Sequence, residues 1–130
     1  MFFQSCGQKE YNIDDLMETD NGLWVEKFTD DGKPVPGKIY DFYGEKNYRK
    51  RVYVGKLFNG KIEGRWVNWY DNGRKSRERY FNDGKIEGLF TKWSEDGKKL
   101  GERIYKEGKR TSQRLWKEDG SVLYSEWFEN

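Results

Sequence analysis

Hydrophobic residues in this chain occur in short runs that are separated by polar turn signals. The runs are rich in Trp, Tyr, Phe, Val and Ile, which favour β-strands. Between them, Gly follows Asp, Asn or Glu in TDDGK, YDNGR, FNDGK, SEDGK, KEGK and KEDGS. Asn-Gly and Asp-Gly are typical of tight hairpin turns, because those turns need a positive φ. Strands of about seven to nine residues suit this spacing better than helices do. The pattern predicts an antiparallel β-meander.

The predicted hairpins repeat with a period of 24 residues. GKIEGRWVNWYDNG begins at Gly60, GKIEGLFTKWSEDG begins at Gly84, and a weaker copy begins at Gly108. Three sets of aromatic or apolar positions coincide when the copies are aligned: Trp69, Trp93 and Trp116; Tyr80, Ile104 and Trp127; Phe81, Tyr105 and Phe128. In a repeat protein each unit contacts mainly its neighbours. We therefore expect an all-β fold, a single-layer twisted antiparallel sheet of repeated β-hairpins. The units are expected near 21–36, 37–59, 60–83, 84–107 and 108–130, so the repeat domain is 21–130.

Side-chain alternation places aromatic rings on both faces of the predicted sheet. Trp66 shares a face with Gly64, and Trp69 points to the opposite face. The glycines that recur in the strands, Gly64 and Gly88, are interpreted as positions where a ring of a neighbouring strand lies flat over the backbone.

Residues 1–20 do not follow the repeat and are expected to form an N-terminal tether or cap. The stretch NIDDLMETDNG predicts a short helix that starts at Asn12 or Asp14, with Leu16 and Met17 on one face, or else an irregular cap. Such a cap would cover one edge of the sheet, because an uncovered edge invites pairing with another chain. The last strand, VLYSEWFEN, has no such cap, so edge-to-edge self-association is expected there.

Composition adds three observations to this picture. Hydrophobic residues make up only 34% of the chain and aromatic residues 18%, so rings must supply most of the buried surface. There is no His and only one Cys, which removes the commonest general base and excludes an internal disulfide. The chain has no run of 18 apolar residues, so the sequence predicts no transmembrane helix. We therefore expect neither enzymatic activity nor a cofactor or metal.

Charge is unevenly distributed along the chain. Residues 1–43 carry four basic and nine acidic residues, a net charge of −5, and residues 44–130 carry a net charge of +7. The repeated Glu78 and Glu102 are interpreted as part of a cross-strand charge ladder and not as a catalytic pair, because a catalytic pair rarely comes from one repeated position. The acidic turns lack the ligand pattern of an EF-hand.

Aromatic and basic residues alternate through the repeats, a combination that also occurs in single-stranded nucleic-acid platforms. The net charge of +7 is modest for phosphate binding, so we do not expect a nucleic-acid partner. Packing within the sheet and binding of a protein partner both remain open for these rings. The candidate partner-binding aromatics are Trp66, Trp69, Trp93, Trp116 and Trp127.

The single cysteine, Cys6, lies in FFQSCGQ. A Ser before it and a small residue after it are similar to the cleavage end of a bacterial lipoprotein signal, in which the Cys is acylated. The preceding Met-Phe-Phe-Gln supplies neither the basic nor the apolar part of such a signal. Cys6 is therefore either a free thiol or a lipidation site that allows membrane association. The expected location is cytoplasmic if Met1 is the true start, and the cell envelope if Cys6 is a lipobox cysteine.

The repeated phrase G-K-x-x-G-x-W/F-x-x-W-Y-x-N-G-x-x-x-x-E-x-x-Y/F resembles the MORN-variant repeat. It is carried by Gly60–Phe81 and Gly84–Tyr105, with weaker copies at Gly22–Gly32 and Gly108–Phe128. The chain is thus similar to YwqK-type, antitoxin-like proteins of bacterial toxin–antitoxin systems. The resemblance implies a non-enzymatic protein-interaction or scaffold module. The alternative is an envelope-anchored lipoprotein, acylated at Cys6, with a structural or binding role.

Overall fold

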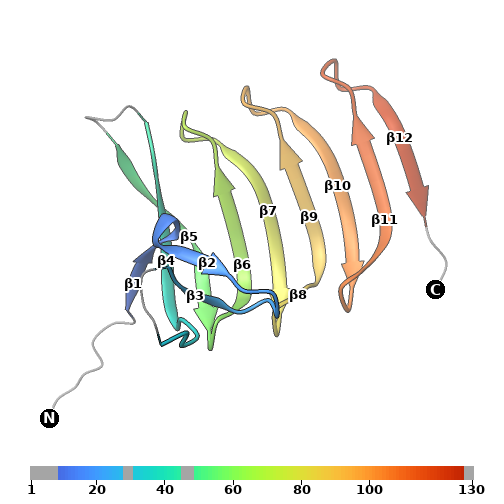
Figure 1. The fold of residues 1–130 in the computed structure, drawn as a ribbon. Coiled ribbons are helices and arrows are strands. Elements are labelled where there is room, and N and C mark those ends of the chain that lie inside the picture. The colour runs from blue at the N-terminus through green and yellow to red at the C-terminus, as the bar shows by residue number, and fades with distance from the viewer. Residues whose placement is uncertain (1–8, 28–30, 45–48, 128–130) are drawn as a thin grey trace, which may run out of the picture.

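The computed structural model describes residues 9–27, 31–44 and 49–127, and these residues form the all-β sheet of hairpins that the sequence predicts (Figure 1). The elements are β1 (Glu10–Asn12), η1 (Ile13–Asp15), β2 (Leu16–Glu18), β3 (Trp24–Glu26), β4 (Gly37–Tyr43), β5 (Lys50–Phe58), β6 (Lys61–Trp69), β7 (Lys75–Asn82), β8 (Lys85–Ile86), β9 (Gly88–Trp93), β10 (Lys99–Lys106), β11 (Lys109–Trp116) and β12 (Val122–Trp127).

One large sheet carries the repeats. Its described strands are ordered β1-β4-β5-β6-β7-β9-β10-β11-β12, with β8 also paired to β7, and β2 and β3 form a separate two-stranded sheet. From β4 to β12 all neighbours are antiparallel, whereas β1 runs parallel to β4. Figure 1 shows the hairpins side by side and gradually rotated, with their turns along two opposite margins.

The turns between repeat units are the tight hairpin turns that the sequence predicts. Asn59, Asp83 and Glu107, each directly before a glycine, have φ values of 48°, 51° and 53°. Two successive residues with positive φ define the hairpin turn that matches the twist of a sheet. Each of these turns therefore places the next strand next to the previous one.

The repeated GKIEG has a structural explanation in these turns. The carboxylate of Glu63 accepts a hydrogen bond of 2.9 Å from the backbone N–H of Asp83, and that of Glu87 accepts one of 2.7 Å from the N–H of Glu107. Each glutamate thus satisfies a backbone donor in the turn that follows one unit later. The same five residues recur because each pair of neighbouring units needs this contact.

The interpretation of the recurring strand glycines as ring contacts is wrong. Gly64 and Gly88 have φ values of 78° and 79°, and a Cβ added to either one would meet nothing within 4 Å. These positions require glycine for its backbone conformation, which other residues rarely adopt. The close ring contact lies at Gly55, where an added Cβ would be 2.6 Å from Cε3 of Trp66.

The predicted N-terminal helix is reduced to one short turn. Residues Ile13–Asp15 form a 3-10 turn, which Asn12 caps by accepting a hydrogen bond of 3.0 Å from the N–H of Asp14. Because strands flank this turn, successive side chains alternate: Leu16 is buried, whereas Met17 is 45% exposed. The segment still lies at the first edge of the sheet, because β1 pairs with β4.

Residues 21–36 do not add a hairpin to the large sheet, although they resemble a shortened repeat. Their strand β3 pairs with β2, and the resulting cap hairpin, residues 16–26, lies in front of the first strands of the large sheet in Figure 1. Its Trp24 packs against Trp66, with 5.9 Å between the ring centroids. The sheet is therefore covered on one face at its N-terminal end.

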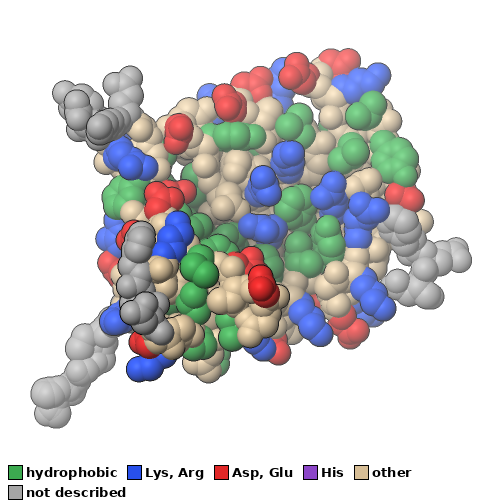
Figure 2. Space-filling model, viewed as in Figure 1, with side chains coloured by type: hydrophobic (Ala, Val, Ile, Leu, Met, Phe, Trp, Pro, Cys, Tyr) green, Lys and Arg blue, Asp and Glu red, His purple; other side chains and the backbone are tan. Residues whose placement is uncertain are grey.

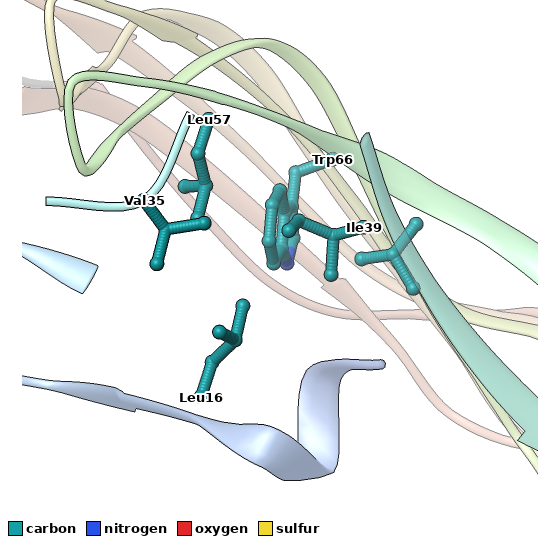
Figure 3. Close-up of a cluster of buried hydrophobic side chains, with 6 residues drawn as sticks. Leu16, Val35, Ile39, Leu57 and Trp66 are labelled. Carbon is teal, nitrogen blue, oxygen red and sulfur yellow. The ribbon is translucent and has the colours of Figure 1, made fainter. Parts of the chain in front are cut away.

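The hydrophobic core lies under this cap hairpin. Figure 3 shows the side chain of Leu16 pointing from β2 toward the side chains of the large sheet. The buried cluster comprises Leu16, Val35, Ile39, Val54, Leu57 and Trp66. Trp66 is 1% exposed and is the largest of its fully buried side chains. No described residue of β9–β12 belongs to this cluster.

Replacement of the central ring is expected to destabilise the fold strongly. We expect Trp66→Ala to lower the free energy of unfolding by about 3–5 kcal/mol, because it opens a cavity in the core. Phe90→Ala, at the repeat position equivalent to Trp66, removes a half-buried ring and should cost only about 1–2 kcal/mol. Urea unfolding followed by tryptophan fluorescence and circular dichroism measures both values. Equal losses would show that the core is not concentrated under the cap hairpin.

The two kinds of glycine predict different costs of substitution. Gly55→Ala would force a Cβ within 2.6 Å of the Trp66 ring and 2.9 Å of a backbone oxygen, so we expect a loss of about 3 kcal/mol or more. Gly88→Ala meets no atom and is opposed only by its positive φ, so we expect about 1–2 kcal/mol. Thermal and urea unfolding of the two variants gives the comparison. A larger loss for Gly88→Ala would restore the ring-contact interpretation at that position.

Candidate interaction surface

The two faces of the large sheet carry different side chains. Directly paired residues of neighbouring strands lie on the same face. The cap-side face, which the cap hairpin partly covers and Figure 2 shows, carries the pairs Trp66–Arg79 and Phe90–Arg103. The far face carries Glu78 with Thr91, Glu102 with Arg114, and Ile104 with Ser112. The two faces therefore offer different chemistry to a binding partner.

The carboxylates of the repeat form ion pairs on the far face. Glu78 Oε2 lies 3.1 Å from Nη2 of Arg65 and 3.0 Å from Nζ of Lys75, and Lys99 Nζ lies 2.6 Å from Glu102 Oε1. Equivalent positions thus supply the second pair, 24 residues later. Arg65 pairs with Glu78 of the neighbouring strand, whereas Lys75 and Lys99 pair with glutamates of their own strands. Arg79 and Arg103 lie on the opposite face.

Glu78 is the most strongly perturbed acid of the far face. The hydrogen bond from Arg65 is the main cause that lowers the pKa of Glu78 from its ordinary value of 4.5 to about 2, and Tyr80 and Lys75 act in the same direction. Tyr80 donates its hydroxyl to Glu78 Oε1 at 2.7 Å. Glu78 is therefore a stabilising anion at neutral pH, and this arrangement explains its recurrence in structural terms.

Three of the five candidate tryptophans are half-buried and engaged within the sheet. Lys75 Nζ lies 5.8 Å from the ring centroid of Trp93, and Lys99 Nζ lies 5.8 Å from that of Trp116. Trp69 donates its Nε1–H to the carbonyl of Tyr53 at 3.1 Å. Each cation–π contact at such a site is worth about 0.5–1 kcal/mol. These rings hold neighbouring hairpins together and leave only part of their surface for a partner.

The other two candidate tryptophans lie at opposite extremes of exposure. Trp66 is a core residue and does not reach the surface, whereas Trp127 on β12 is 71% exposed. Cys6 lies outside the described residues, so its lipidation stays a prediction.

Trp127 belongs to an apolar row; the repeat alignment groups three of its members, Tyr80, Ile104 and Trp127, but did not predict that the row is exposed. The far-face row consists of Tyr80, Leu89, Ile104 and Trp127, which are 40%, 43%, 40% and 71% exposed. Ile104 pairs with Leu89 on one side and Ser112 on the other, and Ser112 pairs with Trp127. Tyr80, Ile104 and Trp127 are equivalent repeat positions. Side-chain alternation along the strands indicates which residues share a face, but it does not show which face is covered.

The far-face row contains a hollow at its C-terminal end. Ser112 is small and buried, and the side chains of Ile104 and Trp127 stand on either side of it. The hollow has a volume of about 120 Å³. A second hollow, of about 550 Å³, lies at the turn margin and is lined by Lys98, Lys99, Trp116, Lys117, Glu118, Asp119 and Gly120.

Within the described ranges, no group of three or more Cys, Asp and Glu residues could hold a metal ion. A search of the same residues finds no helix that is long and apolar enough to cross a membrane. Among them, β12 pairs only with β11, and Val122, Leu123 and Tyr124 of β12 are exposed. Edge-to-edge self-association through β12 stays a prediction.

The fold and its surfaces define this chain as an all-β protein, a mostly antiparallel open sheet of repeated hairpins with a hairpin cap. Comparisons with protein-family models, curated proteins and solved structures find no match to the chain. The resemblance to MORN-variant repeats therefore enters the functional argument as a proposal.

Removal of the Glu78 charge is expected to destabilise the protein in a pH-dependent way. We expect Glu78→Gln to cost about 1–2 kcal/mol at pH 7, where the wild-type carboxylate is charged and hydrogen-bonded. Because the pKa of Glu78 is lowered to about 2 in the folded protein, its contribution is present above pH 4.5 and is lost as the pH falls toward 2. Urea unfolding of both proteins at pH 7, 4 and 2.5 tests this.

Glu102→Gln is the matched control, because it removes a single ion pair at the equivalent repeat position. It should cost less than Glu78→Gln at pH 7. A difference between wild type and Glu78→Gln that stays constant down to pH 2.5 would contradict the lowered pKa.

Proposed function

We propose that this chain is a non-enzymatic protein-interaction module built of MORN-variant repeats, and that a partner protein docks on the far-face row. The observation that supports this proposal is the exposure of four aligned apolar side chains, Tyr80, Leu89, Ile104 and Trp127. Contiguous apolar rows bordered by polar groups are typical of binding surfaces.

The surroundings of the row favour a protein as its partner. The ion pairs of Glu78 and Glu102 lie beside the row, so polar groups border an apolar surface, as they do in protein interfaces. Trp127 and Tyr80 are residue types that often dominate the binding energy. The hollow over Ser112 offers space for one apolar side chain of the partner.

The resemblance to YwqK-type, antitoxin-like proteins supports a narrower version of the same proposal. In that version the docked protein is a toxin and the chain neutralises it by covering its surface. The far-face row supports the interaction in general, and only the resemblance supports the toxin.

An interaction experiment with matched variants tests the module. Purified wild-type chain, the double variant Ile104→Ala/Trp127→Ala and the control Phe58→Ala are immobilised and used for affinity capture from the native cells, with identification by mass spectrometry. Phe58 is a strongly exposed ring on β5 outside the row. We expect one protein to be retained by wild type and by the control and lost with the double variant.

The dissociation constant of the captured protein gives the quantitative test. Loss of two anchor side chains should weaken its binding at least ~10-fold, which corresponds to about 1.4 kcal/mol. Thermal melts check that all three proteins are folded. Equal retention by all three would contradict docking on the row. A captured protein that is the chain itself, as a dimer lost with Trp127→Ala, would replace the foreign partner by a second copy.

A further inference from the structure

Basic side chains gather on the cap-side face, where the strand register also places a carboxylate, that of Glu126 on β12, opposite Gln113. Arg77 on β7 lies directly opposite Lys92 on β9, although like charges in this position repel each other. Arg79 and Arg103 lie on the same face, one repeat apart. Figure 2 shows Lys and Arg side chains over the middle of this face and Asp and Glu side chains mainly along its upper and lower margins.

Arg79 and Arg103 donate hydrogen bonds to neutral amides. Arg79 donates to Asn68 Oδ1 at 2.9 Å, and Arg103 and Arg110 both donate to Oε1 of Gln113, at 2.7 and 3.1 Å. The Nε of Arg79 is buried and has no hydrogen-bond partner among the described residues. The carboxylates of the same strands, Glu78 and Glu102, are committed to the far face. Over β7–β11 the cap-side face therefore carries mainly positive charge, which favours binding of an anionic ligand.

Each repeated arginine on this face lies against an aromatic ring. The guanidinium of Arg79 lies 5.4 Å from the ring centroid of Phe81, and that of Arg103 lies 5.5 Å from that of Phe90. The rings of Phe90 and Tyr105 meet edge to face at 6.5 Å. The face therefore combines positive charge with apolar surface, and a ligand that fits it carries both carboxylates and apolar groups.

The cap hairpin shows how such a ligand lies on this face. Its residue Leu16 belongs to the buried cluster that contains Trp66. Burial and the neighbouring Arg77 lower the pKa of Arg79, and the negative charge of Glu18 acts against this shift. Leu16 and Glu18 come from one short extended strand, β2. A short extended strand with one buried apolar residue and one acidic residue thus already covers part of the first copy of the pattern.

The next repeat offers the same positions without such a cover. Phe90, Arg103 and Tyr105 stand 24 residues after Trp66, Arg79 and Phe81. All three are half-buried, whereas Trp66 is fully buried. In Figure 1 the cap hairpin overlies the first strands of the large sheet, and no described segment lies in front of β10–β12.

We propose that the cap-side face of β7–β11 binds an extended acidic segment of a partner protein. The segment lies over Phe90, Arg103 and Tyr105 in the way that β2 lies over Trp66 and Arg79. Its carboxylates face Arg77, Lys92 and Arg103, and its apolar side chains pack against the rings. This surface is opposite the far-face row and binds independently of it.

Peptide binding to the full chain tests this inference. The probe is a fluorescent peptide with the sequence of residues 14–26, DDLMETDNGLWVE, and the neutral control peptide has Asn and Gln in place of Asp and Glu. Fluorescence anisotropy measures both dissociation constants at low and at physiological salt. We expect the acidic peptide to bind at least ~10-fold more tightly than the neutral one, with weaker binding as salt rises.

Two double variants, each of which removes two positive charges, show whether peptide binding depends on the cap-side face or only on the net charge of the protein. Lys92→Gln/Arg103→Gln should weaken peptide binding at least ~10-fold, whereas Lys109→Gln/Arg114→Gln, with Arg114 on the far face, should change it less than ~2-fold. If Arg103→Gln impairs folding, Lys92→Gln alone, at an exposed position, should still weaken binding measurably. The variant Ile104→Ala/Trp127→Ala should bind the peptide normally.

Three results would overturn the inference: no binding of the acidic peptide, equal loss in both charge variants, or tighter binding of a single-stranded oligonucleotide than of the peptide. The last result would assign the cationic face to nucleic acid. Capture of a partner that depends on the far-face row, together with any of these results, would leave the proposed function in place and remove only this inference.

Discussion

The packing of Trp66 against the backbone of Gly55 is the contact on which the rest of the structure depends. A sheet one layer thick has no interior, so it needs one place where side chains are removed from water on both sides. Gly55 lets the indole lie against the sheet, and the cap hairpin covers the ring from above. The remaining hairpins extend from this end and are held to one another by neighbour contacts.

The contacts between neighbouring hairpins recur at equivalent residues in successive repeat units. Glu63 and Glu87 close the turns that follow them, and Lys75 and Lys99 lie near the tryptophan rings of the next hairpin. Because each contact joins adjacent units, β9–β12 are held by contacts with their neighbours and not by the buried cluster. Trp127, the most exposed side chain of the far-face row, lies on β12.

Equivalent repeat positions acquire different roles because burial differs along the sheet. The position of Trp66 in the core is taken by Phe90 in the next unit, where the ring stays half-exposed. The position of Tyr80 becomes Ile104 and then Trp127, and exposure is highest at the last strand. The repeat thus supplies a regular backbone, and the uncovered units carry the two proposed binding faces. One face is apolar with paired charges, and the other is cationic.

Patterns in the sequence predicted the all-β class, the 24-residue period and the turns. They could do so because Asn-Gly and Asp-Gly turns and strand alternation depend on only a few neighbouring residues. The sequence by itself did not determine that Trp66 is buried and Trp127 exposed, because both are tryptophans in strands. Trp66 lies on the cap-side face under the cap hairpin, whereas Trp127 lies on the far face of β12. Leu16 and Trp66 lie 50 residues apart in the sequence, and no local pattern predicts their contact. Strand register likewise places Arg77, Lys92 and Arg103 on one face. This register depends on the strand pairing and the bulges of the folded sheet.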